Sequence, residues 1–207
     1  MESKLFTPVT FGPLTLRNRT IRSAAFESMC PGNAPSDMLL DYHRSVAAGG
    51  IGMTTVAYAA VTQSGLSFDR QLWMRPEIIP GLRRLTDAIH AEGAAAGIQL
   101  GHCGNMSHKS ICGCMPVGAS SGFNLYSPTF VRGLRADELP EMARAYGRSV
   151  NLAREAGFDS VEIHAGHGYL ISQFLSPSTN HRKDEFGGSL QNRMRFMDMV
   201  MEEVMKA

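Results

Sequence analysis

Apolar runs and amphipathic stretches alternate along the chain. Four short runs of apolar and β-branched residues are typical of strands that are buried on both faces. Each run is followed by a stretch with apolar residues at helical spacing, and three of these stretches end at glycine. The predicted strands are 20–25, 52–60, 95–100 and 158–163, and the predicted helices are 37–48, 76–92, 137–156 and 190–205.

Two further segments lie outside this alternation. Residues 5–18 place turn formers between apolar positions, which predicts a short hairpin with Gly12-Pro13 at its turn. Residues 102–135 are predicted as one long loop. Loops of that length inside a compact domain are usually functional or disordered.

Four strand-then-helix units predict an α/β fold in which helices cover a parallel sheet. An open doubly wound sheet and a (β/α)8 barrel both fit this order. An open nucleotide-binding sheet should show Gly-x-Gly-x-x-Gly after its first strand, and residues 20–25 are not followed by one. A barrel carries its chemistry at the carboxyl ends of its strands. Polar residues cluster at those ends, which favours the barrel: Ser23, Gln99, His102, His164 and His167.

The composition is that of a globular protein. The chain has 207 residues, of which 43% are hydrophobic and 19% charged. Its 20 basic and 19 acidic side chains give a net charge of +1, so we expect neither nucleic acid nor an anionic membrane as partner. No apolar run reaches the roughly 18 residues of a membrane span, and residues 1–22 lack the apolar centre of a signal peptide. We therefore expect a single domain over residues 1–207, located in the cytoplasm.

The four cysteines are Cys30, Cys103, Cys112 and Cys114. Their spacing matches neither paired zinc knuckles nor a small secreted disulfide framework. Reduced thiols in a cytosolic protein are the expected state. The alternative is a metal site built from Cys112, Cys114 and His108, but the sequence offers no clear fourth ligand, and we expect no metal.

The most informative stretch follows the fourth predicted strand. His164, His167 and Tyr169 lie within six residues there. Imidazole N–H groups can donate hydrogen bonds to a substrate oxygen and stabilise negative charge that develops on it. A phenol beside them can deliver a proton. The stretch therefore predicts catalytic and substrate-binding roles for all three residues.

Other interpretations of these residues stay open. The two histidines can be structural, with their ring nitrogens bonded to backbone carbonyls. They can ligate a metal, although no acidic residue lies between them and glycine opposes the helix that zinc proteases use. Tyr169 can be a packed aromatic residue whose hydroxyl lies in water.

Longer motifs surround this cluster. They are 5–8 (Leu-Phe-Thr-Pro), 16–19 (Leu-Arg-Asn-Arg), 98–102 (Ile-Gln-Leu-Gly-His), 164–170 (His-Ala-Gly-His-Gly-Tyr-Leu), 173–177 (Gln-Phe-Leu-Ser-Pro), 180–182, 184–189 and 192–193. Together they span the chain, and they resemble the Old Yellow Enzyme family of NADH:flavin oxidoreductases. The resemblance implies a (β/α)8 barrel that holds FMN, with NAD(P)H as reductant. It also implies a small-molecule substrate with an activated alkene, commonly an enone.

The resemblance further implies roles for individual residues. His164 and His167 would hold the carbonyl oxygen of the substrate over the flavin, and Tyr169 would protonate its α-carbon. Gln99 matches the residue that bonds the pyrimidine edge of the flavin, where an amide offers a donor and an acceptor together. The other predicted cofactor-binding residues match positions beside the flavin and are Ser23, Ala24, Ala25, Phe26 and Tyr58.

Two of these positions depart from the family pattern. Phe26 stands where many relatives have a cysteine or threonine that bonds the flavin. Tyr58 stands where a small residue is common. The resemblance therefore does not fix the redox potential or the substrate range of this chain.

The chain matches the first four of the family's eight strand–helix units, as the N-terminal half of an FMN-binding barrel. In the family, an arginine of the fifth strand contacts the flavin, and loops after the seventh and eighth strands bind its phosphate. A working barrel then requires a homo-oligomer or a separate chain that supplies the complementary half. The alternative is a truncated, catalytically inactive half-barrel. A metal-dependent hydrolase that uses His164, His167 and the cysteines is a third hypothesis, with little support from ligand spacing.

Overall fold

The computed structural model describes residues 3–207, and these fall into two compact units. The first unit comprises the residues up to Ala59 together with Arg70–Gln99 and Leu152–Glu162. The second unit comprises Ala60–Asp69, Leu100–Asn151 and Ile163–Ala207. That residues 1–207 form one domain stays a prediction.

The first unit begins with the predicted hairpin. Strand β1 (Val9–Phe11) pairs antiparallel with β2 (Leu14–Leu16), and Gly12 takes a φ of +55° at the turn. The guanidinium of Arg17 then donates to the backbone carbonyls of Ala47 and Glu92, near the ends of two helices. A single arginine therefore anchors the chain that follows the hairpin to the first unit.

The sheet of the first unit has the strand order β3, β4, β5, β9. Its strands are β3 (Ile21–Arg22), β4 (Met53–Ala60), β5 (Ala95–Gly101) and β9 (Ser160–Ile163). β3 pairs with β4 in parallel, with Ile21 opposite Met53. The predictions for β4, β5 and β9 are confirmed to within two residues. The prediction for the first strand, 20–25, is wrong beyond Arg22, because side chains take the next hydrogen-bonding groups on the edge of β4.

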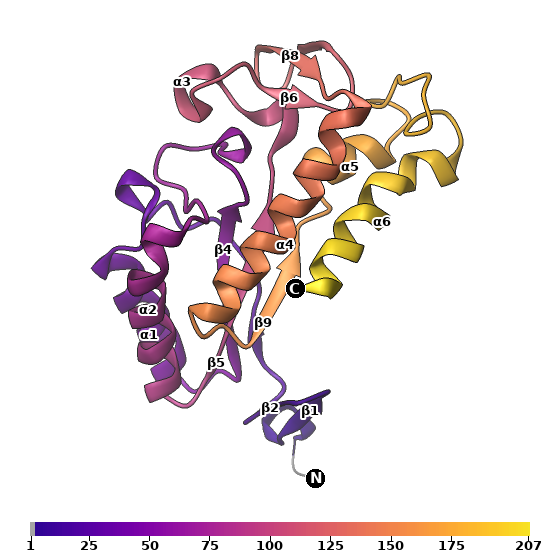
Figure 1. Cartoon of the computed structure of the whole chain (residues 1–207). Coiled ribbons are helices and arrows are strands. Elements are labelled where there is room, and N and C mark those ends of the chain that lie inside the picture. The colour runs from indigo at the N-terminus through magenta and orange to yellow at the C-terminus, as the bar shows by residue number, and fades with distance from the viewer. Residues whose placement is uncertain (1–2) are drawn as a thin grey trace. The chain divides into compact units, whose positions relative to one another are not determined.

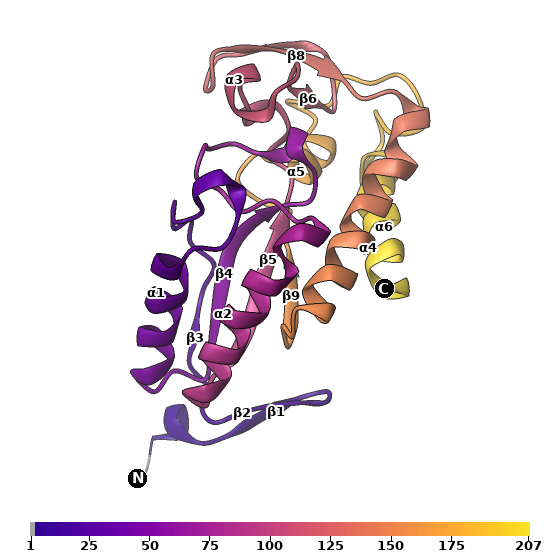
Figure 2. The same cartoon turned by 60° about the vertical axis from the view of Figure 1, so that its left-hand side comes forward.

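Two helices pack on this sheet. Helix α1 (Asp37–Ala48) starts at Ser36, whose hydroxyl accepts a hydrogen bond from the Leu39 N–H. Helix α2 (Ile79–Ala91) continues a 3-10 turn, η4 (Pro76–Ile78), so the predicted helix 76–92 is confirmed with a tighter first turn. α1 and α2 lie side by side (Figures 1 and 2). Their apolar faces supply buried core residues: Leu39, Leu82, Leu85 and Ile89.

The second unit is largely helical. It contains most of α4 (Leu139–Glu155), which follows η6 (Ala136–Glu138), together with α5 (Leu170–Leu175) and α6 (Leu190–Lys206). α4 and α6 run beside each other (Figures 1 and 2), and a Cβ at Gly147 would come 2.9 Å from the carbonyl oxygen of Glu203. Phe174 of α5 stacks on Phe196 of α6 with ring centroids 4.6 Å apart. Glycine therefore permits the close approach of the two long helices.

The predicted loop 102–135 is wrong in part, because it folds into small elements. They are η5 (Gly104–Met106), α3 (Lys109–Cys112), β6 (Val117–Gly118), β7 (Gly122–Asn124) and β8 (Thr129–Gly133). The three strands form a sheet in the order β6, β8, β7. Strands this short leave no readable hydrophobic period, so their pairing with one another decides their structure. The remaining short helical turns are η1 (Lys4–Phe6), η2 (Pro31–Asn33) and η3 (Gln63–Gly65).

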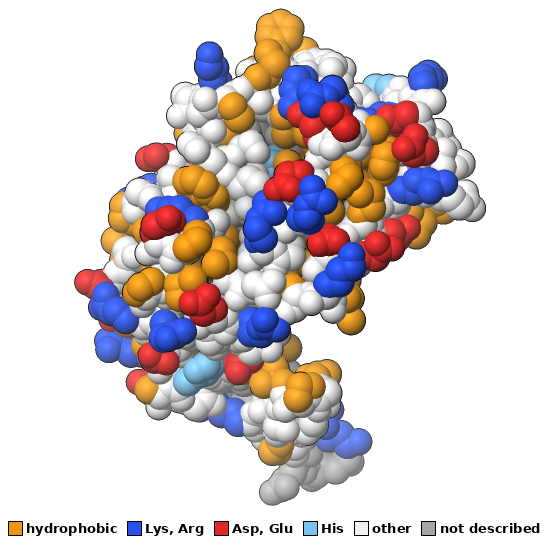
Figure 3. All heavy atoms as spheres, in the orientation of Figure 1, with side chains coloured by type: hydrophobic (Ala, Val, Ile, Leu, Met, Phe, Trp, Pro, Cys, Tyr) orange, Lys and Arg blue, Asp and Glu red, His pale blue; other side chains and the backbone are white. Residues whose placement is uncertain are grey.

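The predicted α/β organisation is confirmed by four strand-then-helix units, β3–α1, β4–α2, β5–α4 and β9–α6. Acidic and basic side chains are interspersed over the face shown in Figure 3. Among residues 3–207, no helix combines the length and apolar character that crossing a membrane requires.

Candidate active site

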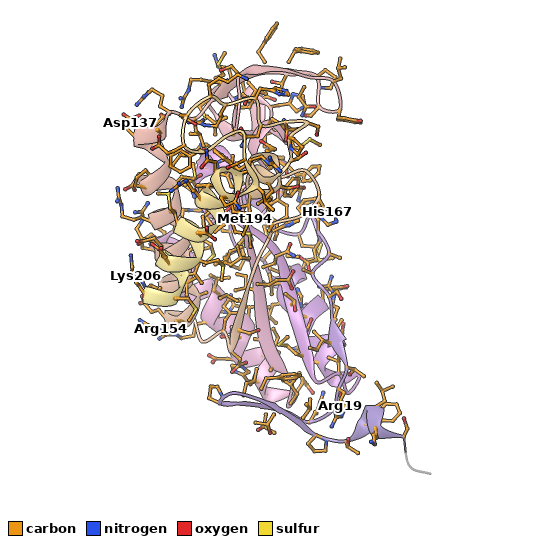
Figure 4. The ribbon with its side chains drawn as sticks, turned by 90° about the vertical axis from the view of Figure 1, so that its right-hand side faces the viewer. Arg19, Asp137, Arg154, His167, Met194 and Lys206 are labelled. Atoms are coloured by element: carbon orange, nitrogen blue, oxygen red, sulfur yellow. The ribbon has the colours of Figure 1, made fainter. Side chains whose placement is uncertain are left out.

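The cluster predicted after the fourth strand is assembled within the second unit. The rings of His164 and His167 meet edge to face with centroids 4.9 Å apart, and the ring of Tyr169 lies 4.7 Å from that of His164. His164 is buried, Tyr169 is half-buried, and His167 is exposed. Figure 4 shows His167 on the loop that follows β9. The cluster therefore combines a buried imidazole with groups that a ligand can reach.

Hydrogen bonds set the position of the protons when both rings are neutral. The backbone N–H of Gly166 donates to Nδ1 of His164 at 3.2 Å, so the ring proton of His164 is on Nε2. That Nε2–H donates to Nδ1 of His167 at 3.1 Å. His167 then carries its own proton on Nε2. The hydrogen bonds thus form a chain that runs from the Gly166 N–H through His164 to His167.

The backbone of this loop is in a conformation that few sequences adopt. His167 has a φ of +54° and Gly168 a φ of +70°, both in the left-handed region. A side chain larger than glycine rarely takes this region, and such residues gather at functional sites. The loop therefore holds His167 in a conformation that residues other than glycine seldom adopt.

A buried amide supports the loop, and the sequence predictions missed it. Gln173 of α5 donates through Nε2 to the carbonyl of Gly168 at 2.7 Å and to the Oδ1 of Asn105 at 2.9 Å. Its Oε1 accepts the Asn105 N–H at 3.2 Å. The side chain is almost fully buried. The signal was present, since Gln173 opens one of the quoted motifs, but periodicity gives no reason to place a glutamine inside.

A cavity of about 540 Å³ opens beside His167 in the same unit. Its walls come from the η5 turn, the β7–β8 hairpin and the segment after α5. Three large side chains of the hairpin that line it are half or more exposed: Phe123, Leu125 and Tyr126. The polar side chains of Asn105 and His181 also face it. The cavity thus offers an apolar wall and a few polar groups, as small-molecule sites commonly do.

His102 belongs to the scaffold of this unit. Its Nδ1 accepts the Gly104 N–H at 3.0 Å, and its Nε2 is 3.1 Å from the Ser64 hydroxyl. Complete burial lowers the pKa of His102 to about 3, so the ring is neutral at pH 7. Its carbonyl accepts the N–H of Leu170 at 2.9 Å, which ties the start of α5 to the end of β5.

The predicted cofactor-binding residues all belong to the first unit. Gln99 is buried on β5 and donates its amide N–H to Glu162 of β9 at 2.5 Å. Tyr58 is buried on β4. Residues 23–26 leave the sheet after β3, and three of them, Ser23, Ala25 and Phe26, are exposed while Ala24 is half-buried. Glu162 was not predicted, although a charged residue inside an apolar strand is a readable signal.

The metal interpretations find no ligand set. Among residues 3–207, no group of three or more histidine, cysteine, aspartate or glutamate side chains could hold a metal ion. His108 bonds the hydroxyl of Ser127 at 2.7 Å. The sulfur atoms of Cys112 and Cys114 lie 3.8 Å apart, and all four cysteines are free thiols.

Comparison with known proteins identifies the lineage. A model of the NADH:flavin oxidoreductase / NADH oxidase family matches residues 4–207. The chain belongs to this family. The resemblance inferred from the motifs is therefore confirmed. The predicted oxidoreductase class, FMN cofactor and nicotinamide reductant agree with the description of the family and with its NADPH dehydrogenase relatives.

Three relatives show how much of a family member is present. The chain is 42% identical to a 4,4'-dithiodibutanoate disulfide reductase of Rhodococcus erythropolis, over 97% of this chain and 50% of the relative. It is 37% identical to an NADPH dehydrogenase of Bacillus subtilis, over 99% of this chain and 60% of the relative. Its structure matches an old yellow enzyme homologue of Zymomonas mobilis with a TM-score of 0.91 and 30% identity.

That match covers 99% of this chain and 60% of the Zymomonas mobilis protein. The chain therefore spans one half to three fifths of these relatives. The prediction of the first part of a (β/α)8 fold is confirmed by this match. The roles of individual site residues, the oligomeric state and the cytoplasmic location stay predictions.

Proposed function

We propose that this chain forms the substrate-reducing part of an FMN-dependent NAD(P)H oxidoreductase. The substrate class is an α,β-unsaturated carbonyl compound whose activated C=C bond is reduced. The observation that carries the proposal is the cluster of His164, His167 and Tyr169, because it gathers two N–H donors and one phenol on one loop.

The two histidines bind the carbonyl oxygen of the substrate. The Nε2–H of His164 already donates to a neighbouring acceptor, and a substrate oxygen takes the place of that acceptor. His167 adds its own Nε2–H from the exposed side of the loop. Donors that are held in place before the reaction stabilise the negative charge that develops on this oxygen.

Tyr169 supplies the proton to the α-carbon. Its ring lies 4.7 Å from the ring of His164 and 6.3 Å from that of His167, so its hydroxyl belongs to the same group as the two donors. Its backbone is fixed by a hydrogen bond from its N–H to the carbonyl of Gly166 and by its place at the start of α5. A positioned general acid of this kind contributes about 10²–10⁴-fold to a rate.

The residues of the first unit fit the ring edge of FMN. Gln99 carries two N–H donors and one carbonyl oxygen, and its bond to Glu162 uses one donor. The amide therefore matches the alternating donors and acceptors of a pyrimidine edge. The remaining proposed contacts are Ser23, Ala24, Ala25, Phe26 and Tyr58. When bound, FMN supplies the hydride that it has received from NAD(P)H.

The cavity beside His167 suggests the kind of substrate. Its hairpin wall presents Phe123 and Tyr126, which suit a flat apolar ring. We therefore expect cyclic enones to be better substrates than short charged ones. A homo-oligomer or a complementary chain completes the barrel in this proposal.

A disulfide is the second candidate substrate. The relative from Rhodococcus erythropolis is named for the reduction of 4,4'-dithiodibutanoate. Its 42% identity to this chain is reason to include that disulfide beside the enone in the same experiment.

The test starts with the purified chain, loaded with excess FMN and then freed of unbound cofactor. NADPH is added without oxygen, followed by 2-cyclohexenone or 4,4'-dithiodibutanoate, while the visible flavin absorbance is recorded. The proposal expects retained flavin and recovery of its absorbance on adding the enone, with cyclohexanone as product. Recovery with the disulfide alone would replace the proposed substrate class. A colourless protein would favour the inactive half-barrel.

A further inference from the structure

The end of β3 is unusual, because side chains take over the role of a strand. β3 pairs with β4 through Ile21 and Arg22, and the backbone of residues 23–26 then leaves the sheet. If the register continued, the backbone of Ala24 would bond the carbonyl of Thr55 and the N–H of Ala57. Neither bond forms.

Two charged side chains occupy these positions on the edge of β4. Nη1 of Arg22 donates to the carbonyl oxygen of Thr55 at 2.7 Å. The N–H of Ala57 donates to Oε2 of Glu27 at 3.2 Å. The groups that would have held Ala24 in the sheet are therefore satisfied without it.

Arg22 and Glu27 also bind each other across the segment that they release. Nη1 of Arg22 lies 2.9 Å from Oε1 of Glu27, and the two side chains are 15% and 4% exposed. Nη2 of Arg22 donates to the carbonyl of Ala25 at 3.4 Å. Residues 23–26 thus form a short bridge that is closed at its base by a buried ion pair.

Two side chains of helix α1 contact the ion pair of Arg22 and Glu27. The Tyr42 hydroxyl accepts a hydrogen bond from Nε of Arg22 at 3.2 Å, and the guanidinium carbon lies 5.0 Å from the Tyr42 ring centroid. Nε2 of the fully buried His43 lies 3.3 Å from Oε1 of Glu27, and its Nδ1 lies 2.8 Å from the Thr54 hydroxyl. All of these partners belong to the first unit.

We propose that Glu27 is a positioning residue that keeps residues 23–26 off the sheet and available to the flavin. This inference rests on the proposed function, because the proposal assigns flavin contact to these residues. Glu27 itself is buried and acts through the segment. Without its carboxylate, the N–H of Ala57 loses its acceptor, and Arg22 loses the ion pair that closes the bridge.

The experiment compares Glu27→Ala and Glu27→Gln with the unchanged chain. Amide hydrogen exchange at Ala57 and over residues 22–29 is measured without added flavin, and FMN affinity is measured by titration. Glu27→Ala should speed exchange at Ala57 about tenfold and weaken FMN binding by about tenfold. Glu27→Gln keeps an oxygen for the Ala57 N–H and should restore much of the exchange protection.

Glu138→Ala is the matched control, because it breaks the 2.7 Å ion pair with Arg132 in the other unit. It should leave exchange at Ala57 and FMN affinity unchanged. Unchanged exchange at Ala57 in Glu27→Ala would overturn the inference. Faster exchange with unchanged FMN affinity would also overturn it, because Glu27 would then be structural only.

The two proposals fail in different ways. If the unchanged chain retains no FMN, the proposed function is wrong. The claim that Glu27 makes residues 23–26 available to the flavin is then also wrong. The exchange rates still decide whether Glu27 holds the segment off the sheet. Circular dichroism of each variant identifies any that does not fold, and Glu27→Gln then carries the comparison.

Discussion

Residues 23–26 of the first unit and residues 164–169 of the second unit differ in how they would serve the proposed function. In the second, His164, His167 and Tyr169 carry the chemistry in their own side chains, and a turn with two left-handed residues orients them. Residues 23–26 are serine, two alanines and phenylalanine, with little chemistry of their own. What distinguishes them is the position of their backbone, which is held off the sheet after Arg22.

The supporting residues differ accordingly. The turn at His167 is held by the buried amide of Gln173, which is neutral. Residues 23–26 are held by a buried ion pair between Arg22 and Glu27. The reactive side chains of the second unit need a support that fixes the turn carrying their rings. The backbone of residues 23–26 instead needs side chains that take its place on the edge of β4. We expect substitutions in the two regions to have separable effects on reaction and on cofactor binding.

Tyr169→Phe should give the largest effect. Removal of the proposed proton donor should slow enone reduction by about 10²–10⁴-fold, or about 3–5 kcal/mol of activation free energy, while FMN affinity stays unchanged. The measurement is the single-turnover rate of flavin absorbance recovery after 2-cyclohexenone is added. Tyr146→Phe removes the same atom from a buried position on α4 and serves as control. Equal rates in Tyr169→Phe and the unchanged chain would remove Tyr169 as the donor.

His102 is a buried structural histidine, in contrast to the histidines of the cluster, and its titration should affect stability. Its pKa of about 3 in the folded chain lies below the usual 6.5, so the unfolded chain binds the proton more tightly. Stability should therefore fall as the pH drops from 6.5 towards 3, by about 3 kcal/mol at pH 4.

The change to measure is the free energy of unfolding at pH 7 and pH 4. His102→Asn removes the titrating group and should flatten the dependence on pH. A variant whose stability falls as steeply as that of the unchanged chain would show that other groups cause the loss.

Gln99→Leu tests the first unit. The loss of the amide should weaken FMN binding by about tenfold, because one or two hydrogen bonds to the ring edge disappear. The enone rate of the flavin that remains bound should not change. Glu162→Gln keeps a partner for Gln99 and is the matched control. FMN titrations that give the same affinity for Gln99→Leu and the unchanged chain would exclude Gln99 from the flavin site.

Gly168→Ala should have the smallest effect. Its φ is +70°, and a Cβ there would meet no atom within 4 Å, so the only cost is backbone strain of about 1 kcal/mol. Thermal unfolding measures it. Gly122→Ala is the control, because that glycine also has open space but no positive φ. A loss of stability as large in Gly122→Ala would show that strain at residue 168 is not the cause.

The sequence was sufficient where local signals agree with the fold. The apolar runs of β4, β5 and β9 and the capped helix α1 lie where the patterns predict them. β4 and β5 are buried along nearly their whole length, as their unbroken apolar runs predict, whereas β9 is partly exposed. The cluster around His164 was readable for a similar reason, since its chemistry is in the side chains.

The sequence was insufficient where distant side chains decide the structure. β3 ends at Arg22 because Glu27 binds an N–H of a strand 30 residues further along the chain. Helix α5 has six residues, too few for a clear period. The strands within residues 102–135 have two to five residues and pair only with one another. No local pattern reports such pairings.

One measurement tests the division between the two regions most directly. The unchanged chain, Gln99→Leu and Tyr169→Phe are loaded with FMN, and the amount of retained flavin and the rate of its reaction with 2-cyclohexenone are recorded on the same samples. We predict that Gln99→Leu retains less flavin but reacts at the unchanged rate, and that Tyr169→Phe retains as much flavin but reacts slowly. If both variants alter both quantities alike, the two regions do not have separate roles and the account is wrong.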